Sequence, residues 1–202
     1  MIPRVDFDVV VDVDPDSLRS VSAETVIDGI ACTHGYEPAA YAGSAWAGAE
    51  ETLEAELDEL RTLDGACSDE DAFDEGAFEA QGERGLSFEF GVSGAVEALC
   101  AAGCPTFASC SGHSEDFSGR SRHPWILFAT DRERLPLLLA AASNAGCGLE
   151  PDGGGLVVMR APSVLESIEF GRALTRARAD FDAIPPIVDR EAAWPEEDDN
   201  LW

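Results

Sequence analysis

The feature that most constrains the fold is an alternation of short apolar segments with amphipathic helical stretches between residues 93 and 181. Apolar residues recur at helical spacing in three stretches, which start near Ser93, Pro136 and Ser163, and a glycine ends each of the first two. A sheet covered by helices buries all of these apolar faces. We therefore expect an α/β or α+β fold, a two-layer sandwich of a mixed sheet covered by helices.

Five segments of this half have the length and apolar character of strands, namely 86–90, 106–109, 125–129, 147–150 and 156–160. The last two flank the sequence PDGGG, which is a hairpin signal. Ser93 is the expected cap of the first helix, and Ser163 with Glu166 forms a capping box for the last helix. Each expected helix therefore lies directly beside an expected strand in the sequence.

The N-terminal part gives a weaker pattern. Residues 5–13 alternate apolar side chains with Asp6, Asp8 and Asp12, which predicts a half-buried strand with solvated carboxylates, followed by a turn at 14–16. A helix is expected from Ser22. Residues 50–63 predict an amphipathic helix, because leucines recur at i, i+4 and i+7.

Residues 64–84 carry mostly acidic and small side chains, with only two large apolar residues, Phe73 and Phe78. This composition predicts a flexible acidic loop or linker. The expected organisation is an N-terminal strand-helix lobe over 1–63, the linker over 64–84, an α/β core over 85–182 and an extended acidic tail over 183–202.

The charge balance bears on the partners of the protein. Asp and Glu number 40, Lys and Arg number 13, all of the latter are Arg, and the net charge is -27. Such a charge repels phosphate backbones, which disfavours general nucleic-acid binding and favours a small molecule or a basic protein as partner. A high-salt host, a GC-rich genome and an acidic binding face each explain the acidity, and the sequence does not choose between them.

No stretch of 18 apolar residues exists, and the first residues lack the charged and apolar regions of a signal peptide. We therefore expect a soluble, cytoplasmic protein with no membrane partner. The six cysteines include no CxxC pair and no closely spaced framework, so free thiols are expected.

The candidate site is the loop that follows the strand at 106–109, because open sheets place ligand sites where strands end. The candidate catalytic residues are Cys110 and His113. The candidate ligand-binding residues are Ser109, Ser111, Gly112, Asp116, Arg120, Arg122 and His123.

Several chemistries remain open for this loop. Cys110 is a possible thiolate nucleophile if His113 or His123 lies beside it in space. A zinc site of Cys104, Cys110 and both histidines is disfavoured, because Cys104 is expected about 15 to 20 Å away at the other end of the strand. A three-ligand site without Cys104 stays open, as does an ordinary turn in which Cys110 is a small buried residue. We assign no metal and no cofactor.

The segment from Ser109 to Gly112 follows a helix and an aromatic-containing strand, and precedes a strand and a Leu/Ala-rich helix that ends in Asn-Ala-Gly. This arrangement resembles the Ser-Cys-Ser-Gly region of the methyltransferase family of wybutosine synthesis, and uncharacterised bacterial proteins with a Ser-Cys-polar-Gly loop. The resemblance covers about residues 92–180. The family uses S-adenosylmethionine on a modified tRNA guanosine, and it has an arginine where this chain has His113. The resemblance implies a shared topology and places the family's reaction among the alternatives.

Three functions follow as hypotheses. The first is binding of a small ligand or a protein partner through the region from Ser109 to His123. The second is an enzyme with its site on that loop, either thiol-based or similar to the S-adenosylmethionine-dependent RNA methyltransferases. The third is an acidic inhibitor or immunity-type protein that binds a basic partner.

Overall fold

A computed structural model describes residues 2–6, 8–18, 46–84, 88–112, 122–152 and 154–185. Its elements in chain order are η1 (Pro15–Ser17), α2 (Trp46–Ala66), α3 (Glu70–Arg84), α4 (Ser93–Ala101), β1 (Thr106–Cys110), β2 (Trp125–Phe128), α5 (Leu135–Ala145), β3 (Gly148–Pro151), β4 (Val157–Arg160), α6 (Val164–Arg176) and α7 (Arg178–Asp182). The expected mixture of helices and strands is confirmed.

The four strands form one sheet in the order β1-β2-β4-β3, and each neighbouring pair is antiparallel. The expected mixed sheet is therefore corrected to an antiparallel one for the named strands. In the described part of the chain, one isolated parallel bridge joins Val11 to Leu149. Alternation along the strands places Ile126, Phe128 and Met159 in the core with no exposed surface. Their neighbours on the other face are half-buried.

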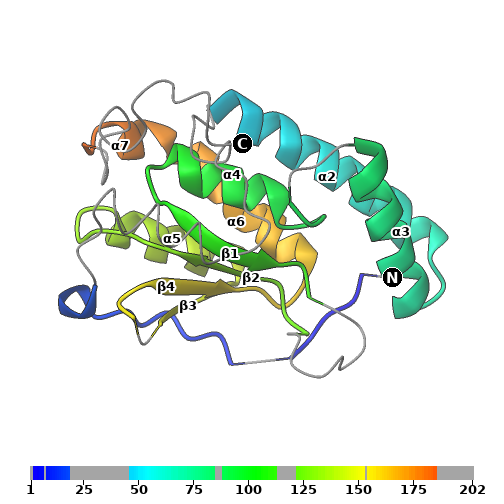
Figure 1. Ribbon diagram of the computed structural model, residues 1–202, viewed down its shortest axis with the longest axis horizontal. Helices are drawn as coiled ribbons and strands as arrows, with labels where there is room; N and C mark the ends of the chain where they lie inside the picture. The colour runs from blue at the N-terminus through cyan, green and yellow to red at the C-terminus, as the bar shows by residue number, and fades with distance from the viewer. Residues whose placement is uncertain are drawn as a thin grey trace, which may run out of the picture.

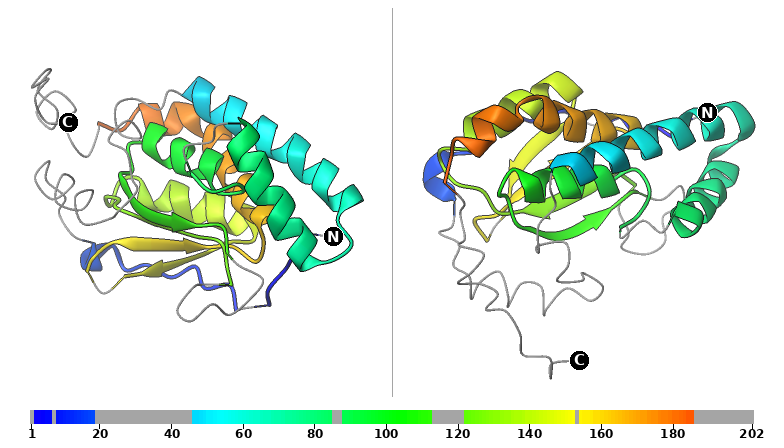
Figure 2. Two further views of the ribbon diagram at one scale, coloured as in Figure 1. Left: turned by 45° about the vertical axis from the view of Figure 1, so that its right-hand side comes forward. Right: turned by 90° about the horizontal axis from the view of Figure 1, so that it is seen from above.

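Helices cover one face of this sheet. Figures 1 and 2 show α4, α5 and α6 packed over it, with α2 lying beyond them. The helix α2 contacts both α4 and α6. Leu53 fits against two glycines, because a Cβ atom at Gly94 or Gly171 would lie 2.6 or 2.7 Å from the Leu53 side chain. The helix expected at 50–63 thus packs directly on the C-terminal half.

The predicted flexible linker at 64–84 is wrong for most of its length, because residues 64–66 belong to α2 and residues 70–84 form α3. Phe73, Ala77 and Ala80 recur at i, i+4 and i+7, and all three join the apolar cluster around Leu60 and Leu63 of α2. The acidic composition indicates disorder, but one narrow apolar stripe is sufficient to stabilise a helix when another helix covers that stripe. Phe78 lies off this stripe and is 78% exposed.

The predicted strand at 86–90 is also wrong over its described part. Residues 88–92 form a turn that leads into α4, and Phe88 and Phe90 enter two different apolar clusters. Ser93 does not cap α4, because its hydroxyl contacts the backbone of Phe88. The carboxylate of Glu56 in α2 accepts hydrogen bonds from this helix end instead.

The N-terminal segment departs from the predicted strand. Val13 is buried, but Val9 and Val11 are 45% and 36% exposed, so the predicted buried face does not exist at these two positions. The physical reason is that the segment lies outside the helical layer and touches the sheet only at its edge. The predicted turn at 14–16 corresponds to η1, which the Asp14 side chain caps. The helix expected from Ser22 lies outside the described residues, as does nearly all of the expected tail.

The remaining local predictions are confirmed. Pro136 lies in the first turn of α5, and Gly146 ends the helix with φ of 72°. The strands β3 and β4 form the predicted hairpin. Ser163 caps α6 by accepting a hydrogen bond from the backbone of Leu165, and Glu166 accepts one from the Ser163 hydroxyl.

Candidate functional site

The candidate loop leaves and re-enters the sheet through a narrow neck. Cys110 at the end of β1 lies opposite Trp125 at the start of β2. Gly112 has φ of +87°, and a Cβ atom on it would lie 2.7 Å from the Arg122 carbonyl oxygen. Only glycine fits this close approach of two backbones without strain. The neck therefore fixes residues 110–112 against residues 122–124.

Replacing Gly112 by alanine is expected to destabilise the protein by about 1 to 3 kcal/mol, because the new Cβ meets backbone and the positive φ is unfavourable for alanine. Urea unfolding followed by circular dichroism measures this change. The matched control is Gly65→Ala in α2, where the added Cβ meets nothing within 4 Å. This control is expected to leave stability unchanged or raise it slightly. Equal stabilities for the two variants would contradict a tight neck.

A half-open pocket with a cavity volume of about 50 Å³ lies beside the neck. Five separate parts of the chain line it: the N-terminal segment, α3, the turn before α4, the loop neck and the start of α6. Such a volume accommodates a group of a few non-hydrogen atoms, and not a whole drug-sized ligand.

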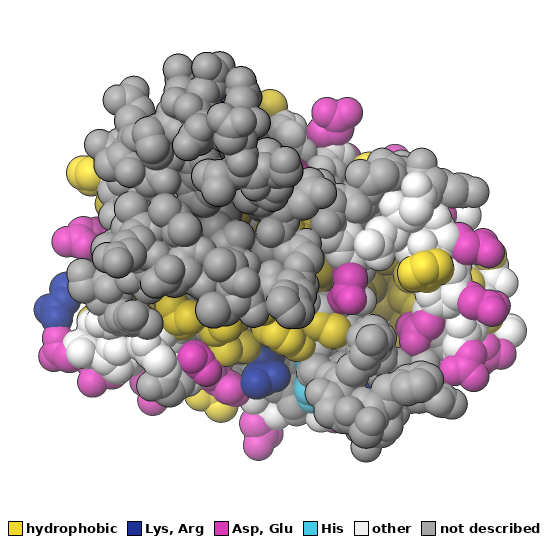
Figure 3. Space-filling model, in the orientation of Figure 1, with side chains coloured by type: hydrophobic (Ala, Val, Ile, Leu, Met, Phe, Trp, Pro, Cys, Tyr) yellow, Lys and Arg dark blue, Asp and Glu magenta, His cyan; other side chains and the backbone are white. Residues whose placement is uncertain are grey.

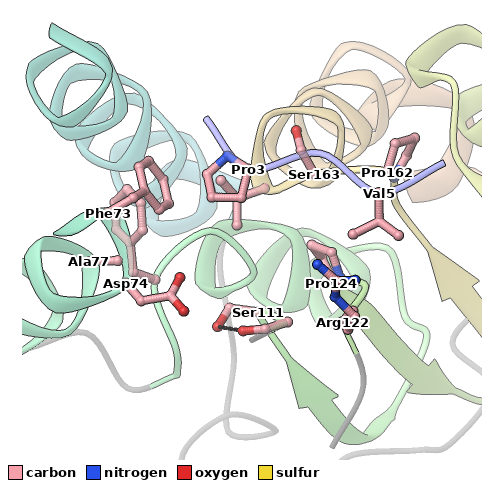
Figure 4. A pocket seen from close by; sticks show the side chains of 13 residues that line it. Pro3, Val5, Phe73, Asp74, Ala77, Ser111, Arg122, Pro124, Pro162 and Ser163 are labelled. Carbon is pink, nitrogen blue, oxygen red and sulfur yellow. Dashed lines mark hydrogen bonds between the residues drawn. The ribbon is translucent and has the colours of Figure 1, made fainter. Parts of the chain in front are cut away.

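The pocket combines opposite charges with apolar walls. Figure 4 shows Asp74 and Arg122 on opposite sides of the pocket, with Ser111 between them. Phe73 and Phe90 supply apolar surface. The arrangement therefore places one carboxylate and one guanidinium in the wall of the same pocket.

The half-buried carboxylate of Glu89 connects one pocket residue, Ser111, to another part of the chain. The backbone N–H of Ser111 donates to Glu89 Oε2 at 2.6 Å, while the Ser111 hydroxyl makes a long contact of 3.4 Å with the Gly112 carbonyl oxygen. Glu89 belongs to the turn before α4, so this hydrogen bond connects the loop to that turn. This hydrogen bond fixes the backbone of Ser111, whereas the Ser111 hydroxyl is held only weakly by its long contact with Gly112.

The structure brings together some of the predicted site residues. Ser111, Gly112 and Arg122 line the pocket, whereas Ser109, Cys110 and His123 are not among its lining residues. Ser109 pairs with Ile126 within the sheet, so it is a strand residue and not part of the loop. The remaining predicted residues, His113, Asp116 and Arg120, lie outside the described residues.

Cys110 is 8% exposed and lies across from Trp125. The backbone N–H of Gly112 donates to Cys110 Sγ at 3.4 Å. Cys110 is therefore a nearly buried residue whose sulfur contacts the backbone of the loop neck.

His123 is half-buried and lies two residues before β2. Its burial lowers its pKa below the ordinary value, and the positive charges of Arg160 and Arg122 lower this pKa further, while Glu150 opposes them. The imidazole is therefore neutral at neutral pH and has a nitrogen lone pair available as a base or ligand.

The zinc hypothesis with four ligands has no support from Cys104. This thiol is fully buried, contacts the Thr130 hydroxyl at 3.8 Å, and its burial raises its pKa to about 12. Within the described ranges no three His, Cys, Asp or Glu side chains are placed to share a metal ion. A set that includes His113 reaches beyond those ranges.

The rate of cysteine alkylation should distinguish the half-buried thiol of Cys67 from the buried thiols of Cys104 and Cys147. Burial raises the pKa of Cys104 and, still more, that of Cys147. At pH 8 about one in ten thousand Cys104 side chains is a thiolate. Iodoacetamide followed by peptide mass spectrometry is expected to modify Cys67 well before either of these two. Modification of Cys104 at the rate of Cys67 in folded protein would contradict the buried environment.

Sequence reasoning missed most of the pocket. The acidic composition of 64–84 places Phe73 and Asp74 in a linker, and the alternation at 86–90 places Phe90 in a strand. The sequence therefore connects none of these three residues to the loop. The spacing of Phe73, Ala77 and Ala80 was the available signal for α3. No signal in the sequence indicated that α3 would reach the loop neck.

Comparison with protein-family models, with curated proteins and with solved structures finds no significant match to this chain. None of the helices in the described ranges has both the length and the hydropathy needed to span a membrane. The site is therefore interpreted from its own geometry.

Proposed function

We propose that this protein binds a small polar ligand, or the polar end of a larger one, in the pocket beside the loop neck. The observation that carries this proposal is the convergence of Ser111, Gly112 and Arg122 with Asp74 around one cavity. The opposed carboxylate and guanidinium match a zwitterionic group best, since an ammonium is attracted to Asp74 and a carboxylate to Arg122.

The test uses six probes, each at high concentration: glycine, β-alanine, ethylamine, guanidinium, acetate and inorganic phosphate. A probe at one hundred times its Kd stabilises the folded protein by about 2.7 kcal/mol, which raises Tm measurably. Chemical shifts in ¹⁵N-labelled protein then locate the binding. We expect glycine or β-alanine to shift the amides of Ser111 and Gly112.

Two variants divide the charges of the site. Arg122→Ala is expected to abolish the rise in Tm caused by acetate and phosphate. Asp74→Ala is expected to abolish the rise caused by ethylamine. Each variant should bind glycine or β-alanine at least tenfold more weakly than wild type. The control is Arg61→Ala, which removes an exposed arginine of α2 that pairs with exposed Asp58. Equal binding to all three variants, or no shift at residues 111–112 with any probe, would exclude this pocket as the site.

A second candidate is an enzyme whose reacting group is Cys110. The Gly112 N–H donated to Cys110 Sγ supports it, as does the resemblance of the Ser-Cys-Ser-Gly segment to the wybutosine-synthesis methyltransferases. Isothermal titration of the full chain with S-adenosylmethionine tests the methyltransferase form. If Cys110→Ala still binds S-adenosylmethionine but no longer transfers its methyl group to an RNA acceptor, the result would favour the enzyme over a pure binding function.

A further inference from the structure

The sheet has an edge that the N-terminal segment covers incompletely. Leu149 of β3 donates its N–H to the Val10 carbonyl oxygen at 2.7 Å and accepts a hydrogen bond from the Asp12 N–H at 3.3 Å. In this parallel bridge the N–H and carbonyl of the intervening Val11 point away from β3. The segment therefore acts as a short edge strand whose outer backbone groups face outward.

The outer edge is also apolar. Val9, Val10 and Val11 are 45%, 42% and 36% exposed, and they are three of the four large exposed hydrophobic residues of the described ranges. Consecutive exposed valines beside open backbone groups are a known site for strand addition. Figure 1 shows this segment along the lower margin of the sheet, outside every helix.

Acidic side chains flank these valines. Asp6, Asp8 and Asp12 are exposed, and no arginine of the described ranges forms an ion pair with any of them. In Figure 3 the lower margin of the molecule shows apolar surface next to acidic side chains. Natural edge strands often carry lysine against unwanted pairing, whereas here every flanking charge is negative.

We propose that the outer edge of residues 8–12 binds an extended, cationic peptide segment of a partner protein, which adds a strand to the sheet. The backbone groups of Val11 supply hydrogen bonds, the exposed valines supply apolar contact, and the aspartates select lysine or arginine side chains. A second copy of this chain fits poorly, because pairing of two such edges would place aspartates against aspartates.

The probe is a nine-residue synthetic peptide that alternates Val and Thr in its centre and carries Lys at both ends. Two control peptides replace each Lys by Glu, or N-methylate alternate residues to remove the backbone donors of one edge. Full-length ¹⁵N-labelled protein is titrated with each peptide. The lysine peptide is expected to shift and protect the amides of Val9 and Val11, and each control is expected to bind at least tenfold more weakly.

Two protein variants test the two contributions separately. Val11→Pro removes the outward N–H and leaves both hydrogen bonds of Leu149, so it should weaken the lysine peptide at least tenfold. Asp8→Lys with Asp12→Lys should reverse the preference toward the glutamate peptide. Glu51→Lys with Asp58→Lys makes the same change of charge on exposed positions of α2 and should keep the preference for lysine.

Four outcomes would overturn the proposal. The first is equal affinity for the lysine and glutamate peptides, the second is binding that maps away from residues 8–12, and the third is no binding at millimolar peptide. The fourth is a dimer in sedimentation that Val11→Pro dissociates, because the edge would then hold a second copy. If Val11→Pro fails to fold, the charge-reversal pair still decides the result.

Discussion

Replacing Glu56 by alanine is expected to lower the free energy of unfolding by about 3 to 5 kcal/mol, one of the largest effects of any single substitution in the described ranges. The Glu56 side chain is fully buried in α2. It accepts hydrogen bonds from the backbone N–H groups of Gly91, Ser93 and Gly94 at 2.8, 3.1 and 3.1 Å. Two of these donors belong to the first turn of α4 and the third, Gly91 N–H, lies in the turn before it, and alanine would leave all three without this acceptor.

Urea unfolding of Glu56→Ala measures this effect. The matched control is Glu51→Ala, which removes an exposed carboxylate from the same helix and is expected to change stability by less than about 0.5 kcal/mol. A similar small change in Glu56→Ala would mean that water replaces the carboxylate at the end of α4. That result would contradict a structural role for this contact between α2 and α4.

Glu56 should also make stability depend on pH. Burial raises its pKa from 4.5 to about 7, although three backbone hydrogen bonds act to lower it and only Glu97 adds to the increase. The folded protein then holds this proton more tightly than the unfolded chain. The contribution of Glu56 is fully present below pH 4.5 and is lost as pH rises through 7, a loss of about 3 kcal/mol.

The measurement compares the unfolding free energies of wild type and Glu56→Gln from pH 5 to pH 8. Glutamine keeps an acceptor but does not ionise, so the variant should lose less stability over this range than wild type. The comparison is needed because other groups also make the protein less stable as pH rises. Burial raises the pKa of Glu97, and the other carboxylates repel one another when they ionise. Parallel pH profiles would assign the whole dependence to those other groups.

Replacing Arg134 by alanine is expected to have the second large effect, a decrease of about 3 to 5 kcal/mol in the free energy of unfolding. The Arg134 side chain is 1% exposed and forms an ion pair with Asp131. It also donates to three backbone carbonyl oxygens, those of Ala102 at 2.8 Å, Ile184 at 3.2 Å and Pro185 at 2.6 Å. Removing the guanidinium leaves the three carbonyl oxygens without this donor, while the Asp131 carboxylate keeps the hydrogen bond from the backbone N–H of residue 134.

Hydrogen exchange distinguishes this anchoring role from a general loss of stability. Arg134→Ala should release the chain after α7, so amides at 181–184 should exchange faster than those of β2 at equal global stability. Arg134→Lys should recover only part of the stability, because one ammonium cannot reproduce the directions of a guanidinium. The control is Arg132→Ala, since Arg132 is 66% exposed and pairs with exposed Asp16. Uniform acceleration of all amides would contradict a local anchor.

One side of the candidate site could be placed from the sequence, because a strand that ends in small and polar residues marks a loop with close backbone approach. Ser111, Gly112 and Arg122 were predicted in this way, and all three line the pocket. Ser109 and Cys110 belong to the strand, where pairing with β2 decides their direction. The other side of the pocket comes from α3 and from the N-terminal segment, and no local pattern specifies such a contact.

Local patterns of residues specify the elements of the C-terminal half: α4, α5, α6, the β3–β4 hairpin and the glycine ends of two helices. These depend on side-chain periodicity and on backbone conformations that neighbouring residues dictate. Long-range packing sets three further features: Glu56 caps α4, residues 70–84 form a helix, and the N-terminal valines stay exposed. Each of these depends on which surface lies opposite, and a residue's burial is set by partners that are distant in sequence.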